Sequence, residues 1–212
     1  MLDANAKAGQ YGEEKLVPHR YDFNERMAMS SSESSNCTVG KILMDNIPGA
    51  TGIRKSTESE DRQGTDWWIG HVSGNEMSVD CKVRQSDWAA THPDEDDLAL
   101  EIWSVKEKRK QGWTLDERKR TDYILWLFKD TGRWCLLPFH MLCSVFRERL
   151  HEWANRRTGY RRAIQKTPTA DGEYTSECVF VPRKIIWDAL YEKFGGQLPC
   201  ENKENPNPKE NK

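Results

Sequence analysis

The chain has 212 residues, of which 36% are hydrophobic, and a formal net charge of -2. This length suits one folded domain, and nine Trp, six Tyr and six Phe concentrate apolar area in large side chains that build a core. The near-neutral charge excludes binding to a polyanion through the global field alone, so any such binding depends on local patches. No apolar run approaches the roughly 20 residues needed to span a bilayer, and we expect a soluble protein.

Six cysteines occur without a CxxC pair and without the Cys/His spacing of a zinc module. Several lie in apolar runs such as WCLLPF and ECVFV, where a thiol packs as a small hydrophobe. We therefore expect buried free thiols. The chain also starts without a signal-peptide pattern, and both features favour a reducing cytoplasm.

The two ends of the chain differ in composition from its middle. We expect residues 1–20 to form a flexible arm because they lack a sustained period, and residues 197–212 to form a disordered tail rich in charge, Asn and Pro. One domain then spans residues 21–196. Its first part predicts two short helices, YDFNERMAM and CTVGKILMDNI, and a Pro-Gly pair ends the second.

From Asp66 onward the pattern predicts strands. DWWIGHV and MSVDCKVR flank a Ser-Gly-Asn turn and predict an antiparallel hairpin. Side chains alternate along a strand, so Asp80 and Lys82 project side by side from one face while Val79 and Cys81 point to the other.

The rest of the chain continues a mixed α/β pattern. LALEIWSV at 98–105 and YILWLF at 123–128 predict two more strands, and the second is apolar throughout and therefore central. MLCSVFRERLHEWANRR predicts a helix, CVFVP a strand, and KIIWDALYEKF a last helix closed by two glycines. The predicted class is α/β, with a mixed β-sheet flanked by helices. The core stripe of the first of these helices comprises Leu142, Val145, Phe146, Leu150 and Trp153.

Two acids and a lysine on the hairpin are the minimum set for hydrolysing a phosphodiester. Carboxylates that hold Mg²⁺ neutralise the scissile phosphate and generate hydroxide near neutral pH. Asp66 and Asp80 would share the cation with the backbone carbonyl of Cys81. Lys82 would orient the attacking water or stabilise negative charge. The alternative is a solvated hairpin face whose charges form cross-strand ion pairs of little energetic consequence.

The hairpin resembles the PD-(D/E)XK nuclease superfamily, whose signature is an acid at the start of one strand and (D/E)-x-K on the next. Here these are Thr65-Asp66 and Asp80-Cys81-Lys82, with Thr rather than Pro at position 65. The resemblance covers about residues 22–192 and implies a restriction-endonuclease-like fold. It implies that Asp66 and Asp80 bind Mg²⁺ or Mn²⁺, that Lys82 is the catalytic lysine and that Gln85 is an auxiliary catalytic group.

The resemblance leaves the third acidic ligand open. Glu60 and Asp61 rank first, because an acid three to nine residues before Asp66 lies on the loop that leads into the hairpin. Glu25 and Glu58 are the other candidates. Glu101 lies on the opposite face of its strand from three apolar residues and either faces the same cavity or pairs with an Arg or Lys.

Two basic clusters have the charge to follow a phosphate backbone, although each is also consistent with a solvated face. The first flanks Gly112-Trp113, where an aromatic ring can stack on a base. The resemblance favours DNA over RNA, allows a homodimer, and extends to phage and bacterial proteins, so the compartment would be the cytoplasm of a bacterial or phage-infected cell. The alternative function is a non-catalytic nucleic-acid- or protein-binding module of the same fold, in phage-host interaction or defence. The residues expected to contact nucleic acid are Lys108, Arg109, Lys110, Arg118, Lys119, Arg120, Arg156 and Arg157.

Overall fold

The computed structural model describes residues 37–157, 159–169 and 172–195. The expected N-terminal arm, the expected helix YDFNERMAM and the expected tail at 197–212 lie outside the described residues. Among the helices that the structure does describe, none is long and apolar enough to cross a membrane.

The predicted hairpin forms the middle of a five-stranded mixed sheet. The strands lie in the order β1-β2-β3-β6-β7, where β1, β2 and β3 form an antiparallel meander, β6 runs parallel to β3, and β7 runs antiparallel to β6. Within the hairpin Trp67 pairs with Val79. The strands comprise Ala50–Lys55 (β1), Trp67–His71 (β2), Glu76–Arg84 (β3), Tyr123–Phe128 (β6) and Trp134–Pro138 (β7).

The expected mixed α/β class is confirmed, but the strands form two sheets rather than one. LALEIWSV forms β4, which pairs with β9 in the register Leu98 to Val181, far along the chain. The edge of β3 that faces away from β2 pairs with β6, and β4 is therefore not part of the first sheet. All described neighbours in this second sheet, ordered β5-β4-β9-β8, are antiparallel. Its strands comprise Asp97–Val105 (β4), Lys110–Gln111 (β5), Arg162–Thr169 (β8) and Gly172–Pro182 (β9).

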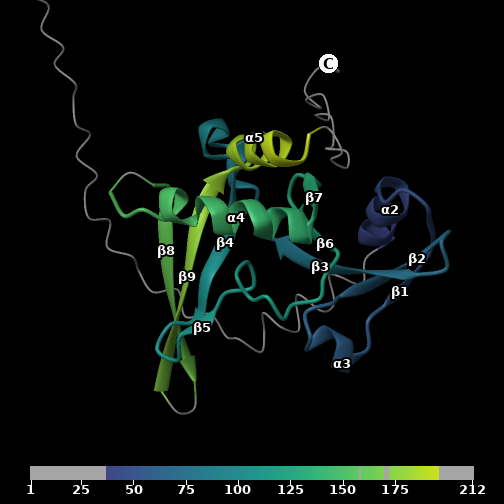
Figure 1. Ribbon diagram of the computed structural model, residues 1–212, viewed down its shortest axis with the longest axis horizontal. Helices are drawn as coiled ribbons and strands as arrows, with labels where there is room; N and C mark the ends of the chain where they lie inside the picture. Colours follow the sequence, from purple (N-terminus) through teal and green to yellow (C-terminus); the bar gives the residue numbers. More distant parts are fainter. Residues whose placement is uncertain (1–36, 158, 170–171, 196–212) are drawn as a thin grey trace, which may run out of the picture.

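The first sheet is covered on both faces. Helix α2 (Cys37–Asn46) packs on one face against Leu125 and Leu127 of β6, while Ile124 and Trp126 of the same strand join a larger core with the second sheet and two further helices. Those helices are α4 (Phe139–Trp153) and α5 (Arg183–Phe194), which pack on each other. Figure 1 shows the two sheets side by side with α4 running across them. Burial on both faces explains why β6 is apolar throughout.

The helix predictions are confirmed for α2, α4 and α5. In α4 four of the five predicted stripe residues are buried, and the fifth, Leu150, packs against the core. Gly195 ends α5 with a φ of 53°, a left-handed conformation that glycine adopts without steric cost. The remaining short elements are α3 (Glu58–Asp61), η1 (Trp88–Ala90) and η2 (Pro93–Glu95).

Candidate active site

Asp66 is held where the polypeptide enters β2. Its backbone N–H donates to the Val79 carbonyl at 2.8 Å, and its carbonyl accepts from the Ser56 N–H at 3.0 Å. Its carboxylate oxygen Oδ2 accepts from the Cys81 N–H at 2.5 Å, which fixes the side chain against the Asp80-Cys81 segment of β3. Burial, and then the charge of Asp80, raise the pKa of Asp66 to about 7, against opposition from the Cys81 hydrogen bond.

Asp80 is a buried carboxylate neutralised by two lysines. It is 3% exposed, its Oδ1 lies 2.9 Å from Lys82 Nζ, and its Oδ2 lies 2.6 Å from Lys119 Nζ. Burial pushes its pKa upward, but the two ammonium groups outweigh burial, and the pKa lies below its usual value. The interpretation of a solvated hairpin face is therefore wrong for Asp80, since a surface pair would be exposed to water.

Lys82 joins the two sheets at this point. Its ammonium contacts Asp80 of its own strand and lies 5.6 Å from the centroid of the Trp113 ring, which follows β5. Burial works to lower the pKa of Lys82, but the Asp80 carboxylate raises it further, and the net pKa is above its usual value. The lysine is therefore held as an ammonium ion against an aromatic face.

Glu101 comes from β4 and faces the same region from the second sheet. Its Oε2 accepts from the Trp113 N–H at 3.0 Å. Burial raises its pKa, while that hydrogen bond and then the charge of Lys82 act in the opposite direction. Of the two interpretations left open by the sequence, the structure supports the one in which Glu101 faces the cavity, because it lines that cavity directly.

Lys119 comes from the loop between β5 and β6, far from the hairpin in sequence. Besides Asp80, its ammonium contacts the Gly64 carbonyl at 3.2 Å, and the side chain is 10% exposed. Gly64 has a φ of 88°, and a Cβ there would lie 2.5 Å from Lys119 Nζ. A side chain at position 64 would thus push the lysine away. The sequence placed Lys119 in a DNA-contacting cluster, and no spacing in the sequence indicated its contact with Asp80.

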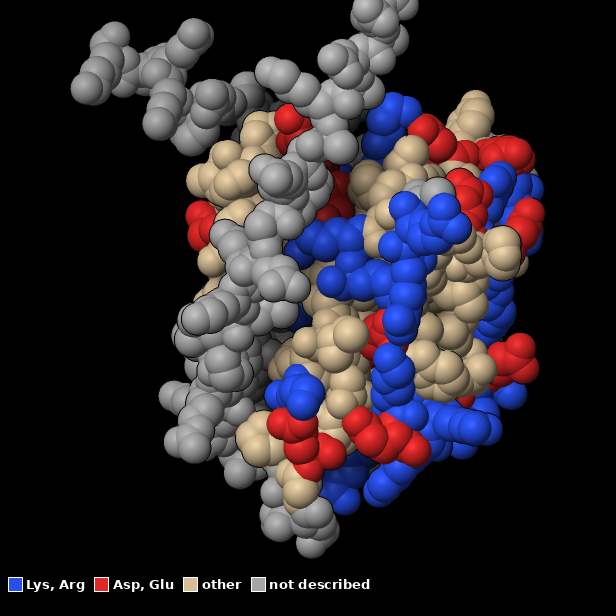
Figure 2. Space-filling model, turned by 90° about the vertical axis from the view of Figure 1, so that its left-hand side faces the viewer, with Lys and Arg blue, Asp and Glu red and all other residues tan. Residues whose placement is uncertain are grey.

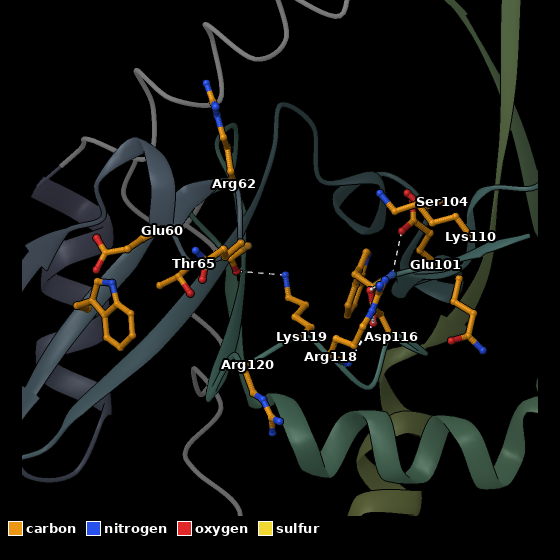
Figure 3. Close-up of a pocket in the computed structure, with 15 residues that line it drawn as sticks. Glu60, Arg62, Thr65, Glu101, Ser104, Lys110, Asp116, Arg118, Lys119 and Arg120 are labelled. Carbon is orange, nitrogen blue, oxygen red and sulfur yellow. Dashed lines mark hydrogen bonds and ion pairs between the residues drawn. The ribbon is translucent and has the colours of Figure 1, made fainter. Parts of the chain in front are cut away.

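Glu101 and Lys119 line a cavity of about 480 Å³ between the two sheets, and Asp66, Asp80 and Lys82 lie behind its described lining. Figure 3 shows Thr65 and Glu60 on one side, Glu101 and Lys110 on the other, and Lys119 reaching between them, with a dashed line for its bond to Gly64. Asp80 does not line the cavity itself, but it bonds Lys119, which does. The full described lining comprises Glu60, Arg62, Gln63, Gly64, Thr65, Trp68, Glu101, Ser104, Lys110, Gln111, Trp113, Asp116, Arg118, Lys119 and Arg120.

The two leading candidates for the third acid differ in their contacts. The Glu60 carboxylate accepts hydrogen bonds from Arg54 and from the N–H and hydroxyl of Thr57, and its pKa is lowered to about 2, first by Arg54. The charge of Asp61 acts directly on Asp66, where it contributes to the raised pKa. Of the two acids, Asp61 is therefore the one whose charge acts on Asp66. Glu25 lies outside the described residues.

The oxygen atoms here are of the chemical kind that a hard divalent cation takes as ligands, although both Asp80 oxygens accept from lysines. The carboxylates of Asp66 and Asp80 and the backbone carbonyls of Gly64 and Cys81 are the oxygen ligands that Mg²⁺ and Mn²⁺ prefer. Among the described residues no three His, Cys, Asp or Glu side chains form a group that holds an ion by themselves. Gln85 follows β3 directly, is exposed, and is not one of the described residues that line the cavity.

The residues expected to contact nucleic acid fall into three places. Lys110, Arg118, Lys119 and Arg120 line the cavity. Lys108 and Arg109 lie on the exposed turn between β4 and β5, and Arg156 and Arg157 lie on the exposed turn after α4. Figure 2, which shows the β8 side of Figure 1, has Lys and Arg side chains gathered in a broad band through the middle of the face.

The prediction of buried thiols outside disulfides agrees with the structure where it describes them: Cys81, Cys135 and Cys143 are buried, Cys178 is partly buried, and these four form no disulfide. Comparison with protein-family models, with curated proteins and with solved structures found no match to this chain.

Proposed function

We propose that this chain is a divalent-metal-dependent phosphodiesterase that cleaves DNA as an endonuclease. The observation that carries the proposal is the convergence of Asp66, from the start of β2, with the Asp80-Cys81-Lys82 segment of β3 beside a basic cavity. A pair of carboxylates next to a lysine provides both a cation site and a positive group for the developing charge. A restriction-endonuclease-like fold is part of this proposal.

Each residue has a role that its contacts support. A bound Mg²⁺ would supply Lewis acidity and lower the pKa of a water molecule. Asp66 and Asp80 would hold the cation, with the Cys81 carbonyl as a further oxygen donor. Lys82, kept as an ammonium by Asp80 and oriented by the Trp113 ring, would stabilise negative charge on the phosphate oxygens.

The cavity supports a nucleic-acid substrate. Its described lining includes Arg62, Lys110, Arg118, Lys119 and Arg120 beside three acids, and Lys119 also bonds Asp80 behind the wall. Clustered Lys and Arg neutralise phosphates and release counterions when a nucleic acid binds. Trp68 on the cavity wall is an aromatic group suited to stacking on a base.

The test is cleavage of plasmid, linear and branched DNA with Mg²⁺ or Mn²⁺. We expect cleavage by the wild type, its loss in Asp80→Ala and Lys82→Ala, and its retention in Asp188→Asn, which removes an exposed acid that pairs with Lys184 on α5. If the pure wild type does not cleave, or if Asp80→Ala cleaves equally well, the proposal is rejected. The Asp188 variant shows that substituting a surface acid does not by itself abolish cleavage, and residual cleavage by Asp80→Ala would reveal a contaminating nuclease.

A second candidate function is a non-catalytic binding module of the same fold. It is favoured by the fact that Asp80 already has two ammonium partners, so its burial needs no metal. This candidate predicts salt-sensitive DNA binding that survives both Asp80→Ala and Lys82→Ala. Binding without cleavage in the assays above would select it.

A further inference from the structure

We propose that Lys119 is a built-in counterion that holds the place of a divalent cation at Asp80 and leaves when the cation binds. This inference rests on the proposed function, because it concerns the same cation site. It also gives the loop between β5 and β6 a role in the cation site, which otherwise consists of residues of the hairpin.

The hydrogen-bond acceptors of the Lys119 ammonium are oxygen atoms of the kind that bind divalent cations. One contact is to a carboxylate oxygen of Asp80 at 2.6 Å, and the other is to the carbonyl oxygen of Gly64 at 3.2 Å. Both are hard oxygen donors of the kind that bind Mg²⁺. The Thr121 hydroxyl also donates to the Gly64 carbonyl, so this oxygen is held in its orientation from a second side.

The local backbone leaves room for this arrangement. Gly64 has a positive φ, and a Cβ on it would lie 2.5 Å from Lys119 Nζ. The absence of a side chain at position 64 therefore allows a cationic group to approach both oxygens. The same space can admit a cation.

Lys119 also stands between the cavity and Asp80. The lysine lines the cavity, whereas Asp80 is 3% exposed. A cation that arrives through the cavity meets the lysine before it meets the carboxylate. In Figure 3 the lysine spans the gap between its own loop and the segment that contains Thr65.

The exchange leaves Asp80 paired with cations throughout. Asp80 retains Lys82 on its other oxygen. When a divalent cation replaces the ammonium of Lys119, the buried carboxylate of Asp80 is therefore never left without a cation. The released ammonium remains on the cavity wall, where the phosphate backbone would lie. One lysine would thus protect the carboxylate in the free protein and contact substrate in the loaded one.

The first experiment measures Mn²⁺ affinity by titration calorimetry without DNA. We expect Lys119→Met to bind Mn²⁺ about tenfold more tightly than the wild type, because the competing charge beside Asp80 is gone. The matched control is Lys110→Met, which removes the same charge from the cavity wall but leaves both ion pairs of Asp80 in place. Its affinity should rise clearly less. In Lys119→Met/Asp80→Asn the gain should disappear.

Equal or weaker Mn²⁺ binding by Lys119→Met would overturn the inference, while wild-type binding that depends on Asp80 would leave the proposed function standing. Failure of the wild type and of Lys119→Met to bind Mn²⁺ would reject the cation site and with it the inference.

The second experiment needs no substitution. Amines of the wild-type protein are acetylated with and without saturating Mn²⁺, and the modified peptides are quantified by mass spectrometry. Lys119 should react several times faster with Mn²⁺ present, whereas Lys193, whose ammonium pairs with Glu148 on α4, should not change. An unchanged or slower reaction of Lys119 under saturation would overturn the inference.

Discussion

The Lys82 ammonium lies 5.6 Å from the centroid of the Trp113 ring, so a residue of the first sheet is positioned by an aromatic side chain that follows β5 of the second. Trp113 is itself tilted against Trp126 and Phe139 of the core between the sheets. The orientation of the proposed catalytic lysine therefore depends on how the two sheets pack, and this interaction joins the core to the site.

Replacing Trp113 should disturb turnover more than substrate binding. We expect Trp113→Ala to lower kcat about tenfold or more, because a misplaced lysine no longer meets the developing charge. Trp113→Phe retains an aromatic face and should stay near the wild-type value. Steady-state cleavage kinetics separate the two effects: a rise in KM with unchanged kcat would instead show that the ring contributes by stacking on a base.

Asp80 should be important for stability as well as for cleavage. In Asp80→Asn the ammonium groups of Lys82 and Lys119 lose their common carboxylate in a buried place, and we expect unfolding to become easier by about 3 kcal/mol. Urea unfolding followed by circular dichroism measures the loss. Asp45→Asn, which removes an exposed acid paired with Lys41 on α2, is the control and should change stability by under about 1 kcal/mol.

The raised pKa of Asp66 predicts that, in the absence of metal, the protein becomes less stable as pH rises. Its folded pKa is about 7 against an ordinary 3.8. Between these two values the folded protein holds more protons than the unfolded chain, so the free energy of unfolding decreases as pH rises, and the loss is complete above pH 7. Asp66→Asn retains an acceptor for the Cys81 N–H and removes this loss.

We therefore expect Asp66→Asn to be more stable than the wild type at pH 8, by about 1 to 2 kcal/mol after allowance for partial solvent exposure. Below pH 3.8 the difference should vanish, because the wild-type carboxyl is then protonated in both states. Urea unfolding with a chelator present, at pH 3.5 and pH 8, checks this. A variant that is less stable than the wild type at pH 8 would contradict it.

Arg133 forms a structural ion network away from the cavity. Its guanidinium bonds Asp87 at 2.6 Å and Asp96 at 2.7 Å, and Asp87 is nearly fully buried. Arg133→Met should cost about 3 kcal/mol because it leaves a buried carboxylate without its cation. The cleavage rate per folded molecule should not change. Arg149→Met, which breaks a more exposed pair with Glu192, should cost under about 1 kcal/mol.

The cations of the cavity should determine how DNA binding responds to salt. Replacing Lys110, Arg118 and Arg120 with Ala should reduce the slope of log affinity against log salt by about 0.9 for each phosphate that the variant no longer neutralises. The comparison variant replaces Arg156 and Arg157 on the turn after α4, and should change the slope less. Fluorescence anisotropy across a salt series measures both. Equal effects would place the DNA path outside the cavity.

Local pattern alone was enough to predict the hairpin, β6 and the helices α2, α4 and α5. The alternation around Asp80 and the apolar run of β6 reflect which faces are buried, and that information lies within a few neighbouring residues. Local pattern did not predict β1 or β8. They are edge strands, one interrupted by Gly52 and the other by Pro168, and they form because another strand is there to pair with.

The sequence by itself determined that Asp66, Asp80 and Lys82 belong to one hairpin, because adjacent antiparallel strands bring their residues together whatever surrounds them. The tertiary structure decided that Asp80 is buried, that Glu101 and Trp113 approach from a second sheet, and that Lys119 bonds Asp80. These relationships join segments that are distant along the chain. They depend on which strands pair and how two sheets pack, and no local spacing of residues encodes that choice.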